Sequence, residues 1–469
     1  MDASPAPGLL RSNAPWLIGW LLSLPPLLAI LYLLTTPLYW VAPLVAIGLV
    51  VLIGLFLRPS LAFYGVILII PFGAYRAIGG GVKLDWILAG TALLVVVLQS
   101  LARRHLPQGL RNPLWTWWLG LMVLFVLSLY ATQWPETVTH NIRNLLVAGL
   151  FMALTMIFVD RKAYLNHLPD LLIASITLGS ASALLGFVFQ IELFADGGGF
   201  TRGTGLTADP NNLALFVIFV TPLLVDRIMH SRHALRPYYL LAMAINIGAL
   251  VSTYSRGGLL AFILCLLMLA WNYRSYFQPR HLGITLMLLM LSGVVFVASV
   301  PASYWERQIS LAQGKDFAMK RRSSYLEVGM EAFKASPLLG HGAGTFRDIY
   351  GESSIGAEFE KEGKTRRRFA HNSYLELLVG TGFVGASVYT GMLLFAWFSF
   401  GRARRYWRES GHRRMGELTA GYQASLSITM IYLLIFSEPL HKYLLLLLAL
   451  SQVALLFARQ DRAAHSAPR

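Results

Sequence analysis

The sequence predicts an all-α integral membrane protein that crosses the bilayer many times. Hydrophobic residues make up 56% of the 469-residue chain and charged residues only 13%, and the mean hydropathy is +0.58. In soluble domains about a quarter of the residues are charged. The apolar residues here form runs of about 17 to 25, the length at which a helix crosses the hydrocarbon core with every backbone amide hydrogen-bonded.

Fourteen apolar runs qualify as candidate transmembrane helices. In chain order they are 16–34, 39–57, 61–75, 85–102, 114–131, 143–159, 170–190, 212–229, 238–254, 257–273, 282–300, 373–400, 418–437 and 440–458. The third run is short and the last pair allows a tilted or re-entrant arrangement, so twelve spans is the alternative. Both counts are even, and an even count places the two termini on the same face of the membrane.

The distribution of Lys and Arg predicts the orientation. With a cytoplasmic N-terminus, the inner segments carry 21 of the 39 cations and the long stretch 301–371 carries 12. Short inner loops are enriched in cations, whereas long loops are translocated largely regardless of charge. Both termini are therefore predicted to be cytoplasmic. The first span follows Arg11 and has no small-residue cleavage site, so we expect it to remain as an anchor. Six cations fall at short outer positions, namely Arg76, Lys83, Arg143, Arg202, Arg256 and Lys442.

The chain divides into three predicted regions. Residues 1–300 hold the N-terminal transmembrane helices with short loops, 301–372 form one long outer loop, and 373–469 hold the C-terminal helices with a short cytoplasmic tail. Within the loop, 320–335 predicts a helix that ends at Ser336-Pro337. The loop is too small and too polar for an independent catalytic domain, so it is expected to cover or wall a site at the outer membrane surface.

Composition and motifs exclude several kinds of protein. The net charge of +16 is divided between two faces of a membrane and is not interleaved with aromatic residues, which argues against nucleic-acid binding. Cys265 is the single cysteine, so no intramolecular disulfide can form. No clustered His/Cys spacing or carboxylate loop typical of a metal site occurs in the sequence. A dedicated metal site is therefore not expected.

Two outer arginines are candidates for binding an anion. Arg202 lies in the glycine-rich stretch 197–205, where the backbone lets a ligand approach closely. Arg256 lies in Ser255-Arg256-Gly257-Gly258 between two apolar runs, where a cation near lipid costs a few kcal/mol unless it is partnered. The glycines allow backbone amides beside the guanidinium to face a phosphate. The alternatives are an arginine that reaches the lipid headgroups for Arg202 and an interhelical pair for Arg256.

His371 is the candidate general base, because it lies where the basic stretch 364–368 meets an apolar run. A histidine with a pKa near 6.5 can accept a proton from a hydroxyl group at ambient pH. Nearby cations lower that pKa and keep the ring neutral. A histidine that only hydrogen-bonds the loop is the alternative. His341 is the rival base, but its surroundings, 340–344, are interpreted as a structural turn.

Further residues are secondary candidates. Arg76, Lys83 and Arg143 would contact a diphosphate or, equally, lipid headgroups. After Asp209, Pro210 suits the start of a helix, and Asn211 or Asn212 would cap that helix or donate to a sugar or phosphate oxygen. Arg366, Arg367 and Arg368 would steer a phosphorylated acceptor, unless they are simply a solvated face of the loop.

Taken together, these motifs and their order resemble the O-antigen ligase/polymerase family over about residues 200–400. The motifs are Arg202 with Asp209-Pro210-Asn211, then Ser255-Arg256-Gly257-Gly258, then the glycine-rich segment Pro337–Phe346, then His371-Asn372-Ser373-Tyr374-Leu375-Glu376, and finally Gly380-Thr381-Gly382-Phe383-Val384-Gly385.

The resemblance implies a glycosyltransferase of the bacterial inner membrane with its active site facing the periplasm. Such enzymes transfer a glycan from undecaprenyl diphosphate without a metal or other cofactor and with inversion. A ligase attaches O antigen to lipid A–core oligosaccharide. Carried onto this chain, Arg202 and Arg256 would bind the diphosphate of the donor, and His371 would activate the hydroxyl group of the acceptor.

Two alternatives remain open at the level of sequence. An O-antigen polymerase or a protein O-oligosaccharyltransferase would share the arginines and the outer loop but use another acceptor. A transporter of lipid-linked glycans is the alternative of another class, because charges inside a membrane also mark transport pathways. The cations here gather at the outer ends of the spans, which favours a one-sided site.

Overall fold

The computed structural model describes residues 53–73, 77–103, 108–191, 195–196, 202–274, 317–358 and 367–466, with short gaps at 56, 80–81, 131 and 208, and four isolated residues between 28 and 36. The described part is all-helical apart from two short antiparallel strand pairs. This confirms the predicted fold class.

The helices are, in chain order, α3 (Pro59–Leu68), α4 (Leu84–Arg103), α5 (Leu114–Leu127), α6 (Pro135–Phe158), α7 (Lys162–Phe189), α8 (Pro210–His230), α9 (Arg236–Ser252), α10 (Arg256–Asn272), α13 (Phe317–Ala335), α14 (Phe346–Glu352), α15 (Ser354–Glu358), α16 (Ser373–Glu409), α17 (Arg413–Tyr432) and α18 (Lys442–Ser466). The strand pairs join β1 (Ala77–Gly79) to β2 (Val82–Lys83) and β3 (Ala195–Asp196) to β4 (Arg202–Gly203).

Six of the described helical segments are long and apolar enough to cross a membrane, and four shorter apolar helices accompany them. The six are Pro135–Phe158, Lys162–Phe189, Pro210–His230, His233–Ser252, Ser373–Glu409 and Lys442–Ser466. The predicted spans 16–34 and 39–57 lie largely, and 282–300 entirely, outside the described residues. The total of twelve to fourteen spans therefore stays a prediction.

Several helices extend beyond the apolar runs that predicted them. α6 and α7 each begin eight residues before the predicted spans 143–159 and 170–190, and α16 continues to Glu409. The apolar run marks only the part of a helix that would lie in hydrocarbon, whereas backbone hydrogen bonding continues into the polar ends. The loop helix predicted at 320–335 is confirmed, because α13 covers Phe317–Ala335 and ends at the predicted residue.

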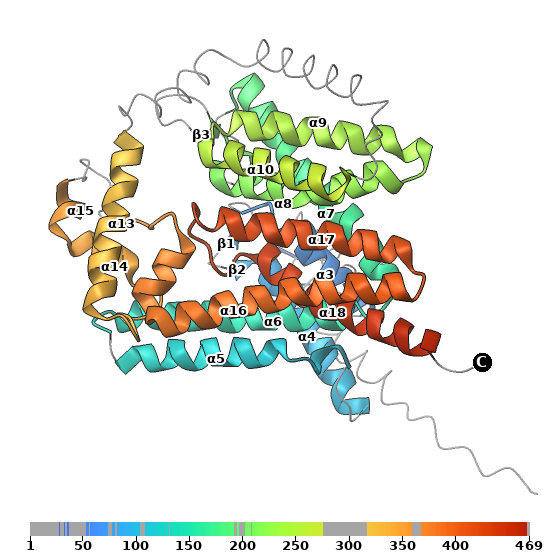
Figure 1. Ribbon diagram of the computed structural model, residues 1–469, viewed down its shortest axis with the longest axis horizontal. Helices are drawn as coiled ribbons and strands as arrows, with labels where there is room; N and C mark the ends of the chain where they lie inside the picture. Colours follow the sequence, from blue (N-terminus) through green and yellow to red (C-terminus); the bar gives the residue numbers. More distant parts are fainter. Residues whose placement is uncertain are drawn as a thin grey trace, which may run out of the picture.

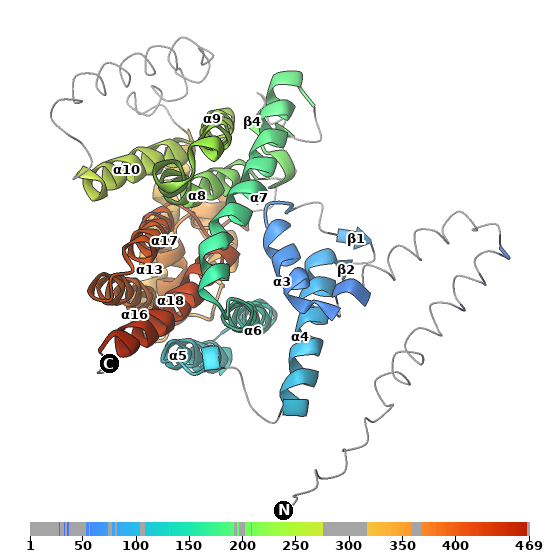
Figure 2. The same cartoon turned by 90° about the vertical axis from the view of Figure 1, so that its right-hand side faces the viewer.

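The core of the bundle lies around α18, which has 83% of its most apolar window buried. α16 packs against α17 and α18, α17 packs against α8, and α7 packs against α8 and α9. Figure 1 shows these helices running side by side, with α13, α14 and α15 at one end and the C-terminus at the other. In Figure 2, α3 and α4 lie beside α6 and α7, where they also make contacts.

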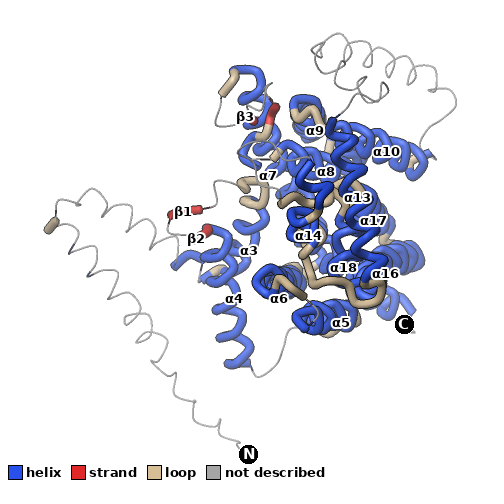
Figure 3. Tube along the Cα trace, turned by 90° about the vertical axis from the view of Figure 1, so that its left-hand side faces the viewer, coloured by secondary structure: helices blue, strands red, loops and turns tan. Residues whose placement is uncertain are grey.

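Glycine-rich segments fasten the loop helices to α16. The amides of His341 and Gly342 donate to the carbonyls of Val379 and Gly380, both at 2.9 Å. Gly340 has a φ of 71°, and a Cβ there would lie 2.5 Å from the carbonyl carbon of Gly380. Only glycine tolerates both the left-handed backbone and this close approach. The interpretation of 340–344 as a structural turn agrees with these contacts, and Figure 3 shows α13 and α14 across this end of the bundle.

Candidate functional site

Three helices begin at the end of the bundle where α13 lies, and each has a side-chain cap. Asp209 caps α8, Ser255 caps α10 and Asn372 caps α16. A capping oxygen satisfies one or two of the free amides, while the rest of the first turn keeps its partial positive charge. Helix N-termini of this kind favour phosphate and other anions.

Hydrogen bonds hold these three helix starts together. The Ser255 hydroxyl donates to Oδ1 of Asn211 at 3.0 Å, which joins α10 to α8. The Tyr432 hydroxyl, at the end of α17, donates to the Asn211 carbonyl at 3.0 Å. The amide of Ser373 donates to the Leu433 carbonyl at 2.9 Å and so ties α16 to the same turn. The positive ends of the three helices are therefore fixed relative to one another.

Two residues before these helix starts have a left-handed backbone without being glycine. Tyr254 has a φ of 51° and His371 a φ of 52°, and each directly precedes a capping residue. Such conformations cost about 1 to 3 kcal/mol and persist only where the surrounding structure holds them. The strain orients Ser255-Arg256 in one case and His371 in the other.

The structure brings Arg202, Arg256 and His371 to the same end of the molecule. Arg202, in β4, donates from Nε to the Thr253 carbonyl at 2.8 Å, three residues before Arg256. Arg202 also interacts electrostatically with Tyr432, as Asp209 does. Asp209 in turn interacts with His371. Residues from four separate segments thus share one polar cluster.

Arg322 is a residue of this cluster that the sequence did not single out. It is an exposed side chain on α13 and interacts electrostatically with Arg256, His371 and Tyr432. The sequence predicted the helix, and its spacing places Arg322 and Tyr325 on one face. No sequence signal shows where that helix docks, so the electrostatic interaction of Arg322 with Arg256 depends on the tertiary structure.

His371 is partly buried and lies in a positive environment. Burial, followed by the charge of Arg322, lowers the pKa of His371 from 6.5 to about 4. Arg321 and Arg368 act in the same direction, and Asp209 opposes them. The His371 ring also packs against Tyr325, with 6.1 Å between ring centroids. His371 is therefore neutral at ambient pH and has a lone pair that can accept a proton.

The rival histidine has a structural environment. Nε2 of His341 lies 2.8 Å from the carbonyl oxygen of Ala332 on α13. The backbone amide of His341 donates to the Val379 carbonyl on α16. These contacts link the end of α13 to the glycine-rich turn. His371, rather than His341, lies among the charged groups of the cluster.

The secondary candidates lie in several places. Asn211 and Asn212 do not cap α8, because Asp209 accepts hydrogen bonds from both of their amides at 2.8 and 2.9 Å. Asn211 instead binds Ser255. Arg76 and Arg366 lie outside the described residues, and Lys83 belongs to β2 with no described side chain.

The remaining three cations, Arg368, Arg367 and Arg143, do not lie together. Arg368 belongs to the polar cluster, and the other two lie elsewhere. Arg368 interacts with His371 and Tyr325, within the polar cluster. Arg367 pairs with Asp348, with Nη1 and Oδ1 3.3 Å apart. Arg143, on α6, lies over the ring of Trp86 at 5.5 Å. Arg143 and Arg367 both line a neighbouring cavity rather than the cluster.

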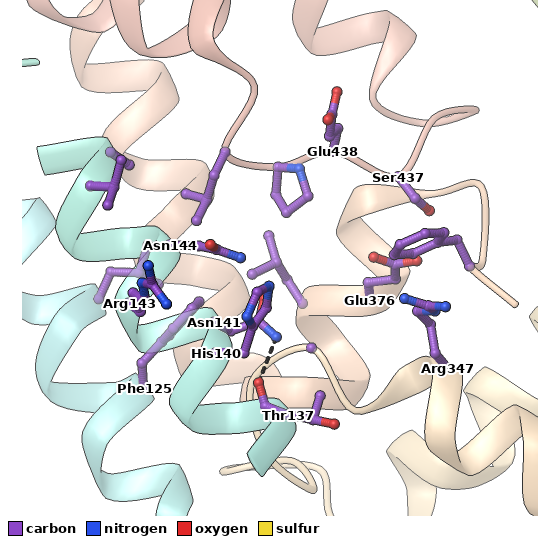
Figure 4. Close-up of a pocket in the computed structure, with 18 of the residues that line it drawn as sticks. Phe125, Thr137, His140, Asn141, Arg143, Asn144, Arg347, Glu376, Ser437 and Glu438 are labelled. Carbon is purple, nitrogen blue, oxygen red and sulfur yellow. Dashed lines mark hydrogen bonds between the residues drawn. The ribbon is translucent and has the colours of Figure 1, made fainter. Parts of the chain in front are cut away.

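This cavity has a volume of about 870 Å³ and is lined from α4, α5, α6, α14, α16 and the start of α18. Figure 4 shows His140, Asn141 and Asn144 on α6 on one side of it and Arg347 beside Glu376 on the other. Within the part of the chain that the structure describes, no group of three or more His, Cys, Asp or Glu residues is arranged to hold a metal ion.

The family comparison covers most of this site. A family model described as O-antigen ligase matches residues 241–390, a range that includes Arg256, Arg322 and His371 but not Arg202. No curated protein matches the chain. With its apolar helices and this match, the chain is a polytopic membrane protein that contains an O-antigen ligase family domain at residues 241–390.

Proposed function

We propose that this protein transfers O-antigen polysaccharide from undecaprenyl diphosphate to lipid A–core oligosaccharide at the periplasmic face of the bacterial inner membrane. The observation that carries the proposal is the meeting of Arg202, Arg256, Arg322 and His371 beside three capped helix N-termini. The family match supports lipid-linked glycans as the substrate class.

In the proposed reaction, an acceptor hydroxyl oxygen attacks the anomeric carbon of the donor glycan. The new glycosidic bond forms as the bond from the anomeric carbon to the phosphate oxygen breaks. The bonding electrons leave with undecaprenyl diphosphate, and the hydroxyl proton passes to His371. Attack opposite the leaving group inverts the configuration at the anomeric carbon.

The guanidinium groups of Arg202, Arg256 and Arg322 would stabilise the departing diphosphate. A cation about 4 Å from a phosphate charge is favoured by about 4 kcal/mol at an effective dielectric constant of about 20, before desolvation. The leaving phosphate oxygen gains charge in the transition state, so a fixed cation there favours the transition state over the bound donor. No step of this proposal needs a metal ion.

The environment of His371 is suited to a base that works beside a bound anion. In the absence of donor, burial and Arg322 hold the pKa of His371 at about 4. A bound diphosphate adds negative charge next to the ring and raises this pKa. The donor would thus increase the basicity of His371 when the acceptor is attacked.

An assay with purified protein, an undecaprenyl-diphosphate glycan and lipid A–core oligosaccharide tests the proposal. We expect product from the natural protein and from His233→Ala, a histidine exposed at the other end of the bundle, but not from His371→Ala. Product formation that His371→Ala leaves unchanged would overturn the role of the base. Product formed only with a second lipid-linked glycan as acceptor would identify a polymerase instead.

A further inference from the structure

A second cavity lies at the end of the bundle that carries the C-terminus. Its volume of about 380 Å³ falls within the range of about 300 to 1,000 Å³ that is typical of ligand pockets. The lining comes from the end of α10, the end of α16 and the first half of α17, namely Leu269, Asn272, Tyr273, Arg404, Arg408, Arg413, Glu417, Ala420 and Gly421. Figure 2 shows these three helices side by side, and α17 packs against both of the others.

The charges that line this cavity are not balanced. Three arginines face one carboxylate, that of Glu417. Glu417 is already engaged, because Oε1 lies 3.1 Å from Nε of Arg413 and Oε2 lies 3.1 Å from Nε2 of His230. In the described part of the chain, Arg404 and Arg408 form no ion pair with a carboxylate, and their charges repel each other. The cavity therefore carries excess positive charge.

Other arginines at this end of the bundle have partners within the protein. Arg227 pairs with Asp170, and Arg414 pairs with Asp226, in both cases across two helices. A cation close to hydrocarbon costs free energy unless a group of opposite charge accompanies it. Among the residues that the structure describes, no such group accompanies Arg404. A partner from outside the chain would supply the missing negative charge.

The guanidinium group of Arg404 is held in place for such a partner. Its Nη1 donates to Oε1 of Gln423 at 2.8 Å, and the Gln423 side-chain amide donates to the Trp397 carbonyl at 3.1 Å. A guanidinium group has five N–H donors in a fixed plane, and Gln423 occupies one of them. The planar arrangement of the others suits a phosphate group, which offers several acceptor oxygens.

The cavity lies where the apolar runs of three helices end. The predicted spans end at 273 on α10 and at 400 on α16, and the span on α17 begins at 418. Aromatic residues such as Tyr273 and Trp271 are typical of the headgroup level of a membrane. The surface of α10 next to the cavity is apolar and exposed, with Leu260, Ile263, Leu264, Leu266 and Leu267. A ligand that has both a phosphate and acyl chains fits this arrangement.

We propose that this cavity binds the phosphate of an anionic phospholipid, whose acyl chains lie along the exposed apolar surface of α10. Arg404 and Arg408 bind the phosphate oxygens, and the side-chain amide of Asn272 donates to the headgroup. A zwitterionic phospholipid carries an ammonium group that the arginines repel, so the net charge of the headgroup decides binding. Inorganic phosphate gains the same polar contacts but buries no apolar surface on α10.

Two substitutions on α16 test the cavity. Arg404→Gln and Arg408→Gln each remove one lining charge. Arg405→Gln is the matched control, because Arg405 is 66% exposed, pairs with Glu409 and does not line the cavity. The probes are dioleoylphosphatidylglycerol, dioleoylphosphatidylcholine, which has the same chains, and inorganic phosphate. Native mass spectrometry of the full-length protein in detergent measures each dissociation constant, and thermal unfolding is followed in the same mixtures.

We expect the natural protein to bind one phosphatidylglycerol at least about tenfold more tightly than phosphatidylcholine. Each cavity substitution should weaken phosphatidylglycerol binding about fivefold, which corresponds to one arginine beside an anionic headgroup. Arg405→Gln should stay within about twofold of the natural protein. Phosphatidylglycerol should raise the thermal midpoint of the natural protein and of Arg405→Gln more than that of Arg408→Gln.

Equal affinities for the two phospholipids, or unchanged phosphatidylglycerol binding in the cavity variants, would overturn the inference. Inorganic phosphate that binds as tightly as phosphatidylglycerol would also overturn it, because the cavity would then hold a free anion. Arg408 is exposed, so Arg408→Gln still decides the matter if Arg404→Gln, which loses its bond to Gln423, does not fold. Lipid binding is measured without product formation, and its outcome is therefore independent of the proposed glycosyl transfer.

Discussion

The arginines at the two ends of the helix bundle differ in their electrostatic partners. At the end that carries the C-terminus, the arginines that lie between α7, α8 and α17 are paired with carboxylates. Nε of Arg227 lies 2.6 Å from Asp170, and Nη2 of Arg414 lies 2.6 Å from the fully buried Asp226. At the end that carries α13, Arg256 and Arg322 repel each other, and Arg321 and Arg368 add to the same positive field around His371.

This difference distinguishes arginines that stabilise the fold from arginines that are available to bind a ligand. A matched pair inside a bundle has little capacity to bind a further ion, and losing one partner leaves a buried charge. A cluster with excess positive charge costs stability until an anion arrives. The paired end is therefore expected to control folding, and the positive end is expected to control donor binding and turnover.

The largest expected effect is that of His371→Ala on turnover. Loss of a general base costs about 10²- to 10⁴-fold in rate. Because the ring is not part of a buried ion pair, the thermal midpoint of the purified protein should change little. Turnover assays and thermal unfolding of the same preparation check the expected loss of rate and the expected unchanged thermal midpoint. A large loss of thermal stability without a loss of turnover would reverse the assignment of this residue.

Arg414→Ala should have the opposite outcome at the other end. Removal of its guanidinium leaves the buried Asp226 with Arg227 at 3.6 Å and His230 at 3.3 Å. Because Arg414 is itself 36% exposed, the cost should lie below the value of about 3 to 5 kcal/mol for a fully buried pair. Arg413→Ala is the matched control, because Arg413 is 81% exposed and pairs with Glu417 within one helix turn. Such exposed pairs contribute about 0.3 to 0.5 kcal/mol. Equal thermal midpoints for the two variants would contradict the contrast between the ends.

Arg256→Ala and Arg322→Ala should weaken donor binding without loss of fold. A hydrogen bond to a charged group contributes about 1.5 to 3 kcal/mol, so each change should raise the dissociation constant for undecaprenyl diphosphate about 10- to 100-fold. Titration of the ligand into protein in nanodiscs measures this constant. The prediction fails if the acceptor KM rises instead and diphosphate binding is unchanged.

The pH dependence of turnover sharpens the assignment of His371. Its pKa of about 4 in the free protein predicts that kcat/KM is retained at pH 5 and falls only near pH 4. The acid limb of kcat should lie at higher pH, because bound diphosphate raises the pKa. Arg322→Ala should move the free-protein limb upward as well. An acid limb near 6.5 in the natural protein would contradict the environment described for His371.

The same histidine has a predicted effect on stability. Between pH 6.5 and about 4, the unfolded chain binds a proton at His371 that the folded protein does not. The free energy of unfolding therefore decreases as pH falls through this window. His371→Gln should remove this contribution, and pH-dependent thermal unfolding of both proteins measures the difference.

The smallest expected effect comes from Arg367→Ala. Arg367 is 59% exposed and already pairs with Asp348, and exposed pairs contribute about 0 to 1 kcal/mol. We expect a change of at most about fivefold in kcat/KM for a phosphorylated acceptor, with less dependence on salt. Assays at two ionic strengths check the change. A loss of turnover as large as that of His371→Ala would move Arg367 into the reaction itself.

Much of the fold is determined by the sequence alone. Long apolar runs must become helices in lipid, because no other local structure satisfies their backbone amides. The predicted spans begin at 212, 257 and 373, within two residues of the starts of α8, α10 and α16 at Pro210, Arg256 and Ser373, although the predicted cap of α8 was wrong. For the same local reason, the helix over 320–335 was predicted to within three residues.

The sequence also singled out Arg202, Arg256 and His371, because a cation or a titratable ring at the end of a span is costly without a role. It did not identify Arg322, the residue that interacts with two of them. Helix periodicity fixes which residues share a face, but not which other helix that face meets.

The tertiary structure alone decided which residues of the segment 367–376 face the cavity and which face the polar cluster. Arg367 and Arg368 are neighbours in a basic run and were interpreted together, yet one pairs with Asp348 beside the cavity and the other acts on His371. That division depends on the amides of Ala370 and Asn372 binding Glu376 and Ser437. Ser437 is 65 residues from Asn372 in the chain, and contacts over such a separation arise only when the whole bundle packs.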